Sequence, residues 1–298
     1  MSTDNFIQKD RIYELIIGDY RNGRGLLINN LQVTFDITKA ANNKQRTNSA
    51  AIEIYNLSAE SLKLLDTDYP AAVFSAGWAG SGLKRLFADQ VTNVTTRKSG
   101  TDRITQIQMG ERYKEITHEM LSSITPPGRT VQDVAEDIRK AIPGVSRGVY
   151  NGTNLSNPIL YGYPLIGSPK DMLDELSSKY GLDWQIDDGI LYLHNSDRAF
   201  SENFGQAFVI SRYTGLVENV YRISGDKRRS KKDKVKKQGV QFKVLLNPQL
   251  IAGSIIKIED TLINGWYKID SLRHSGGYRD TPWYTEVQAS ALEKVSKQ

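Results

Sequence analysis

The residues of this chain that could take part in chemistry are three histidines, a glycine-rich segment and an adjacent pair of carboxylates. His118, His194 and His274 lie far apart, and none has a second histidine at the helical spacing that a zinc-protease motif uses. Metal ligation needs a local cluster of ligands, which surrounds none of the three. We therefore expect each histidine to be structural or at the surface, with His274 in a glycine-rich turn, and we predict no metal site.

The segment 77–83, GWAGSGL, is the nearest match to a phosphate-binding loop. Its glycine Gly82 is followed by Leu83 instead of lysine, and the segment lies between predicted strands instead of opening a helix. We predict a β–β connection there. Asp187 and Asp188 fall in a predicted turn, where aspartate is favoured for local hydrogen bonding. A glycosidase pair of carboxylates separated in the sequence stays open, but no pattern points to one.

Composition narrows the function further. The chain of 298 residues has no cysteine, which excludes disulfides, thiolate zinc sites and cysteine nucleophiles. No apolar run approaches eighteen residues, so no membrane span is expected. The N-terminus lacks the basic and then apolar shape of a secretion signal, which indicates synthesis in a cytoplasm. We predict no catalytic residue and no cofactor, and a protein that is not an enzyme.

The charge of the chain is concentrated in residues 226–237, DKRRSKKDKVKK, whose eight basic and two acidic residues sum to +6. The whole chain carries +5, so all other residues sum to −1. Like charges with almost nothing apolar to bury predict a solvated loop. Contact with an acidic partner is an alternative, and so is nucleic acid, although no aromatic residue is present to stack on bases. The predicted partner-contact residues are Lys227, Arg228, Arg229, Lys231, Lys232, Lys234, Lys236 and Lys237.

Residues 1–117 show the alternation of apolar and polar positions that is typical of β strands. Ser58 is placed to cap one short helix, and Lys98 to Gly100 reads as a hairpin turn. We predict an N-terminal β domain over this range. The predicted strands cover residues 12–17, 31–39, 50–57, 71–78, 86–96 and 103–109.

Residues 118–204 change to a mixed pattern. Thr130 opens a predicted helix with Asp133 at the third position, and Ser168 opens a second one that stops at Gly181. A hairpin with an Asp188–Gly189 turn follows. We predict a small α+β insert domain.

Residues 205–298 return to strands. Alternating apolar residues run through 240–246 and 283–289, with Asn247–Pro248 as a corner. Asn264–Gly265 is predicted to form a tight turn, because both residues tolerate positive φ. We predict a C-terminal β domain that carries the basic loop 226–237.

Several segments occur in an order that is informative as a set. They are AIEIYNLSAESLKLL at 51–65, the strand pair at 86–111, Thr214-Gly215-Leu216, and the C-terminal segments 244–258 and 266–290. In this order they resemble the baseplate hub proteins of contractile-tailed bacteriophages, and the resemblance spans most of the chain.

That resemblance implies a homotrimer at the end of the tail tube, in the baseplate of a virion, synthesised in the host cytoplasm. Each subunit of that family carries two tube-like β domains, so three chains form a pseudo-sixfold ring. The ring matches the hexameric tube above, receives the trimeric spike below and leaves a channel for DNA passage. The implied partners are the tube protein, the spike protein, and baseplate wedge or other tail proteins. Ring closure would also occupy strand edges between subunits.

The predicted fold is therefore mainly β with an α+β insert. Two tube-protein-like antiparallel β-barrel or sandwich domains, 1–117 and 205–298, flank a small α+β domain, 118–204. Three other functions stay open: a tail-associated cell-wall hydrolase, a hub-like part of a contractile secretion or injection device, and a DNA binder based on the loop 226–237. Turnover of peptidoglycan would support the hydrolase, and images of assembled particles would identify a secretion or injection device. Deletion of the loop without loss of DNA retention would exclude the DNA binder.

Overall fold

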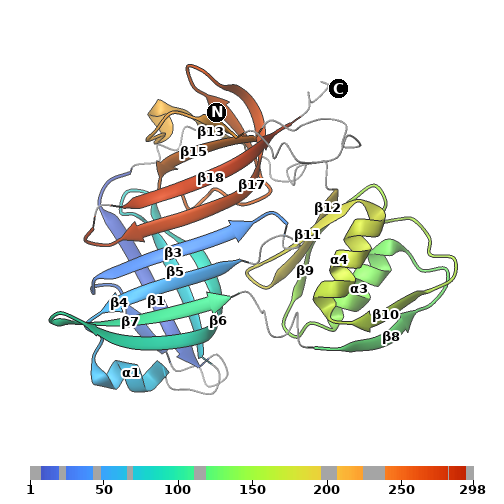
Figure 1. Cartoon of the computed structure of the whole chain (residues 1–298), viewed down its shortest axis with the longest axis horizontal. Coiled ribbons are helices and arrows are strands. Elements are labelled where there is room, and N and C mark those ends of the chain that lie inside the picture. Colours follow the sequence, from blue (N-terminus) through green and yellow to red (C-terminus); the bar gives the residue numbers. More distant parts are fainter. Residues whose placement is uncertain are drawn as a thin grey trace.

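The computed structural model describes residues 8–19, 25–42, 48–65, 70–110, 119–195, 207–223, 239–280 and 282–292. These residues form a mainly β protein with one large, mostly antiparallel sheet and a small α+β unit beside it (Figure 1). This is the fold class that the sequence predicts. The predicted domain boundaries at 117/118 and 204/205 lie outside the described residues. No helix in the described ranges is long and apolar enough to cross a membrane.

The N-terminal half follows the predicted strand alternation. On β3, Val33, Phe35 and Ile37 are buried while the residues between them are partly exposed. Ser58 caps the helix, its Oγ accepting the Ser61 N–H at 3.1 Å. The elements are β1 (Arg11–Asp19), β2 (Gly25–Ile28), β3 (Val33–Ala40), β4 (Ser49–Tyr55), α1 (Ala59–Leu65), β5 (Pro70–Trp78), β6 (Gly82–Ser99) and β7 (Asp102–Gly110).

The C-terminal half contains a second group of strands. Trp283, Thr285, Val287 and Ala289 are all buried on β18, as their alternation predicts. The elements are β13 (Phe208–Ile210), the 3-10 helix η2 (Arg212–Thr214), β14 (Tyr221–Ile223), β15 (Gly239–Leu245), β16 (Ile255–Glu259), β17 (Asn264–Gly277) and β18 (Trp283–Ala291).

The turn prediction at Asn264–Gly265 is wrong. Both residues belong to β17 and pair with Glu259 and Ile258 of β16. The chain reverses one step earlier, where the Asp260 N–H donates to the Ile263 carbonyl at 3.2 Å. This register buries Ile256 and Ile258 of β16, and a one-residue slip would turn that face to water.

The two halves join in one sheet. Residues 271–277 of β17 pair antiparallel with 34–40 of β3, and the cores also meet. Trp283 lies in the N-terminal core, where its ring contacts Phe35 edge-on with centroids 5.1 Å apart. The Trp78 Nε1–H donates to the Leu246 carbonyl at 2.8 Å. The two halves are therefore joined both by strand pairing and by contacts between their cores.

The halves also repeat one strand order. The N-terminal path runs β3-β4-β7-β6-β5-β1, and the C-terminal path runs β14-β15-β18-β17-β16-β13. Matching these two paths position by position also preserves the order of the strands along the sequence. The long strand of each half carries a register shift, between Val91 and Asn93 on β6 and between Ile269 and Ser271 on β17. One pairing differs, because β1 is antiparallel to β5 whereas β13 is parallel to β16.

The insert has its own core and follows the predicted helices. Thr130 and Asp133 form a capping box at the start of α3. Ser168 caps α4, which ends at Gly181 in the left-handed conformation. Asp188 and Gly189, both at positive φ, make the predicted hairpin turn. The elements are β8 (Leu121–Thr125), α3 (Val131–Lys140), β9 (Ser146–Asn151), β10 (Tyr163–Gly167), α4 (Pro169–Tyr180), β11 (Leu182–Asp187) and β12 (Ile190–Asn195).

Candidate functional site

The two histidines that the structure describes are structural residues. His274 lies within β17 and not in a turn, which corrects the prediction; its Nδ1 is 2.9 Å from the Thr285 Oγ1. His194 is the last residue but one of β12 and is equally buried. Burial, with Lys39 nearby, lowers the pKa of His274 to about 3, and burial, with Lys268 nearby, lowers that of His194 to about 3. His118 lies outside the described residues.

The glycine-rich segment is a tight strand connection, as predicted. Gly77 lies in β5 opposite Leu83, and the Ser81 N–H donates to the Trp78 carbonyl at 2.9 Å. A Cβ on Gly77 would lie 2.3 Å from the Gly82 carbonyl oxygen, so only glycine fits there. The glycines permit close backbone approach within a hairpin.

The aspartate pair does more than shape a turn. Asp187 accepts a hydrogen bond from the Lys39 Nζ at 2.7 Å, and Asp188 lies 2.9 Å from the Arg85 guanidinium. Burial raises the pKa of the Asp188 carboxyl, against the opposing effects of Lys39 and Arg85. The Asn48 Nδ2 also donates to the Ile186 carbonyl at 2.9 Å. Cations and an amide of the N-terminal half thus fasten the hairpin of the insert.

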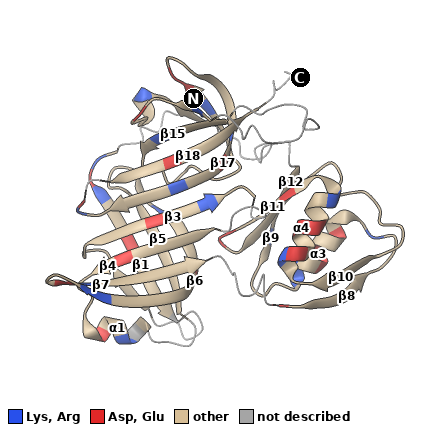
Figure 2. Cartoon of the chain, in the orientation of Figure 1, with Lys and Arg blue, Asp and Glu red and all other residues tan. Residues whose placement is uncertain are grey.

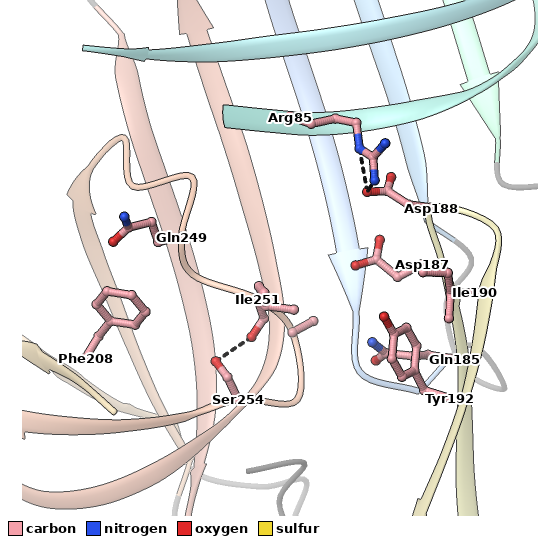
Figure 3. Close-up of a pocket in the computed structure, with 11 residues that line it drawn as sticks. Arg85, Gln185, Asp187, Asp188, Ile190, Tyr192, Phe208, Gln249, Ile251 and Ser254 are labelled. Atoms are coloured by element: carbon pink, nitrogen blue, oxygen red, sulfur yellow. Dashed lines mark hydrogen bonds and ion pairs between the residues drawn. The ribbon is translucent and has the colours of Figure 1, made fainter. Parts of the chain in front are cut away.

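A pocket of about 330 Å³ lies beside this junction (Figure 3). Asp187 and the Arg85–Asp188 pair lie on one side, and Phe208 lies on the other. Ser254 donates its hydroxyl hydrogen to the Ile251 carbonyl at 2.7 Å, so neither carboxylate activates it. Each of the two carboxylates has a cation partner, Lys39 for Asp187 and Arg85 for Asp188.

The more extensive feature is a polar face of the large sheet, formed by β15, β18, β17, β3, β4, β7 and β6. A row of alternating charges crosses it, from Lys243 to Glu286 at 3.5 Å and from Glu286 to Arg273 at 3.8 Å. The row ends where the Arg273 Nε donates to the Asp36 Oδ1 at 2.8 Å. That hydrogen bond raises the pKa of the guanidinium. Figure 2 shows the isolated charges of both signs on these strands.

The other side chains of this polar face are mostly neutral hydrogen-bonding groups. Their alignment follows from the strand pairing, because residues directly opposite one another share a face. Charges on it are compensated, as for Arg97, which lies 2.8 Å from Glu53. Residues that contribute are Gln241, Gln288, Ser271, Ser275, Thr38, Ser49, Gln106, Gln108, Asn93 and Thr95.

Two strand edges at the ends of this face are open among the described residues. All three residues of β14 are exposed, and β14 pairs only with β15. The second part of β6, residues 91–99, pairs only with β7, and Thr95, Thr96 and Arg97 are exposed. Open edges of this kind are ready to pair with another strand.

The insert presents an uncharged apolar face at β8 and β10. Pairing places Ile124 opposite Pro164, and Ile166 opposite Ser122, on the outer side. Ile124 and Ile166 are 69% and 68% exposed, and Tyr161 nearby is 93% exposed. Exposed apolar patches commonly mark interaction surfaces.

The predicted partner-contact loop, 226–237, lies outside the described residues. Within the described ranges no three histidine, aspartate or glutamate residues gather to hold a metal ion. The polar face of the sheet was not predicted from the sequence. It arises only when strands far apart in the chain pair with one another.

The fold is similar to that of solved bacteriophage tail proteins. No family model and no curated protein sequence matches the chain. Among solved structures, the 43 kDa tail protein of prophage MuSo2 from Shewanella oneidensis aligns at 10% identity and a TM-score of 0.65, covering 93% of this chain and 98% of its own. A tail protein from Neisseria meningitidis aligns at 13% identity with a TM-score of 0.66, covering 93% of this chain and 96% of its own.

A third similar structure comes from a secretion system. It is an Escherichia coli component of the type VI secretion system, described as structurally similar to phage T4 tail proteins gp27 and gp5. It aligns at 12% identity with a TM-score of 0.63, covering 88% of this chain and 74% of its own. At such identities the likeness establishes the fold.

Proposed function

We propose that this protein is a baseplate hub of a phage tail, a homotrimer whose pseudo-sixfold ring joins the hexameric tail tube to the trimeric spike. The observation that carries this is the repeated strand order of the two halves, joined side by side through β3 and β17. Two equivalent wedges in one chain let three chains imitate six. The domains are 1–117, 118–204 and 205–298, with the second as the insert.

The polar sheet face forms the wall of the channel in this proposal. Its charges are paired with one another, as Arg273 is with Asp36 and Glu286. Such a wall offers DNA no unbalanced positive surface to bind, and a phosphate backbone is retained mainly by unpaired Lys and Arg. DNA can therefore pass without being held.

The role is structural and not enzymatic, and it is carried out in the virion tail baseplate. The partners are tube, spike and wedge or other tail proteins. The basic loop 226–237 contacts an acidic neighbour or the DNA passage. Neutralising Lys231, Lys232, Lys236 and Lys237 together should then slow assembly or DNA exit, and normal particles from that variant would contradict the contact.

The mass of the purified chain in solution tests the trimer. Three chains of 33.5 kDa give 100.5 kDa, which light scattering measures directly, and electron microscopy should show a three-fold ring with a central hole. A strict monomer at high concentration contradicts the proposal.

A related second candidate is the corresponding part of a contractile secretion device. The observation that favours it is the similarity to the secretion-system component. Images of assembled particles separate the two, because only a phage hub copurifies with virions that contain DNA.

A further inference from the structure

The seam between the two halves of one chain gives a template for the seam between chains. At the internal seam, β3 pairs with residues 271–277 of β17. On the same edge of β17, residues 264–268 pair with β16. In the repeated strand order β14 corresponds to β3, and β6 corresponds to β17. In the described part of the chain, these two counterparts are the strands with open edges at the ends of the polar face.

We infer that β14 of one copy pairs antiparallel with residues 91–99 of β6 in the next copy, and that this pairing closes the ring. The inference rests on the proposed trimer and specifies its interface. Eight strands per chain then line the channel, β14, β15, β18, β17, β3, β4, β7 and β6, so three chains give 3 × 8 = 24 strands. A closed sheet of this kind has no free edge.

The register shifts fix the position of one strand. Asn93 and Ser271 each follow the shift in their long strand, so they are equivalent. Four residues further on, Arg97 is therefore equivalent to Ser275. The same count makes Thr95 equivalent to Arg273.

Stepping across neighbouring strands fixes the position of the other. In the N-terminal half Asn93 pairs with Gln108, which pairs with Ala51, which pairs with Asp36. In the C-terminal half the corresponding steps run from Ser271 through Gln288 and Gln241 to Tyr221. Tyr221 is thus equivalent to Asp36.

Since Asp36 lies opposite Ser275 at the internal seam, Tyr221 lies opposite Arg97 of the next copy, and Ile223 lies opposite Thr95. Both pairs suit a sheet surface. A guanidinium stacks well on an aromatic ring, and two β-branched residues pack well across strands. Tyr221 is 55% exposed in the single chain and gains a partner in the ring.

Cysteine cross-linking tests the pairing, and the absence of native cysteine removes any background. The in-register variant is Tyr221→Cys with Arg97→Cys, since directly opposite residues have Cα atoms about 4.5–5.5 Å apart, within disulfide range. The matched control is Tyr221→Cys with Thr95→Cys, two residues out of register, where diagonal neighbours lie about 7–8 Å apart. Within one chain the two strands are seven strand steps apart, about 34 Å at 4.8 Å per step, so every cross-link joins two chains.

We expect mild oxidation to convert the in-register variant to covalent trimer, reversed by reductant, and to leave the control at least ten-fold less cross-linked. A trimer by light scattering that cross-links in neither variant overturns the strand pairing and leaves the hub proposal standing. A protein that remains monomeric at high concentration overturns both. Hydrogen exchange of the unmodified protein is a second measurement, because amides of 221–223 and 92–99 should be slower in trimer than in monomer.

Discussion

The two buried histidines predict that this protein loses stability on mild acidification. Both imidazoles have a pKa of about 3 in the folded chain, against about 6.5 in an unfolded one. The unfolded state therefore binds two protons that the native state does not, so stability falls as the pH drops below 6.5 and keeps falling toward 3. Between pH 7.5 and 5.0 each histidine contributes about 2 kcal/mol to this loss, about 4 kcal/mol for the pair. That is a large share of an ordinary stability of 5–15 kcal/mol.

The surroundings of His274 explain why its pKa is low. The Thr285 Oγ1 accepts the Asn247 N–H at 3.1 Å and lies 2.9 Å from the imidazole Nδ1. Protonation would place an uncompensated charge in a buried site with Lys39 nearby. Asp188 acts in the opposite sense, because its raised pKa means the native carboxyl takes up a proton more readily.

Urea unfolding at several pH values from 7.5 to 5.0 measures the slope, expected near 2.7 kcal/mol per pH unit below pH 6. His274→Gln keeps an acceptor for Thr285 and should halve the slope. Ile52→Val is the matched control, costing about 0.5–1.5 kcal/mol without changing the slope. The reasoning would be refuted if the unfolding free energy changed by less than about 1.4 kcal/mol per pH unit, the value for one proton. It would also be refuted if His274→Gln left that slope unchanged.

Three further substitutions test the junction, the sheet face and the insert. Lys39→Met leaves Asp187 without its cation and should lower the free energy of unfolding in urea by about 3–5 kcal/mol. Adding Asp187→Leu should recover most of that loss. Equal losses in the single and the double variant would contradict the buried pair. Arg273→Ala removes an exposed ion pair with Asp36 and should cost at most about 1 kcal/mol, less in 1 M salt. Gly181→Ala forces a side chain into the left-handed conformation at the end of α4 (φ 66°) and should cost about 1 kcal/mol or more, which thermal unfolding of the insert would show.

Features set by neighbouring residues were predictable from the sequence. The capping box at Thr130 and the Asp188–Gly189 turn each depend on side chains within three positions. Strand alternation on β3 and β18 was equally clear, because one face is buried and the other is not.

Features set by distant pairing were not predictable. The β3–β17 seam joins residues more than 230 positions apart, and no residue type marks it. Asn264–Gly265 has strong turn chemistry, yet burial of Ile256 and Ile258 on β16 decided where the chain reverses. The strands β13 and β14 have three residues each, too few for any periodicity to appear.

The equivalence of the two seams yields one more test, by transplanting an ion pair. Inside the chain Asp36 and Arg273 bridge the seam, but their counterparts Tyr221 and Thr95 cannot form an ion pair. The internal seam is also held by the covalent chain, which raises its effective concentration, whereas the seam between chains has no such tether. Tyr221→Asp with Thr95→Arg would place the same pair between subunits.

We expect the double variant to recover trimer stability relative to the two single variants, with a coupling of about 0.2–1 kcal/mol that weakens in high salt. Thr95→Arg alone places a cation opposite Ile223 and should dissociate at lower dilution than the double variant, whereas Tyr221→Asp alone already lies opposite Arg97 of the next copy and should lose less. Sedimentation of all four proteins across a dilution series measures the coupling. Strict additivity would mean that residues 221 and 95 are not diagonal neighbours across chains as Asp36 and Arg273 are within one, and the deduced register would then be wrong.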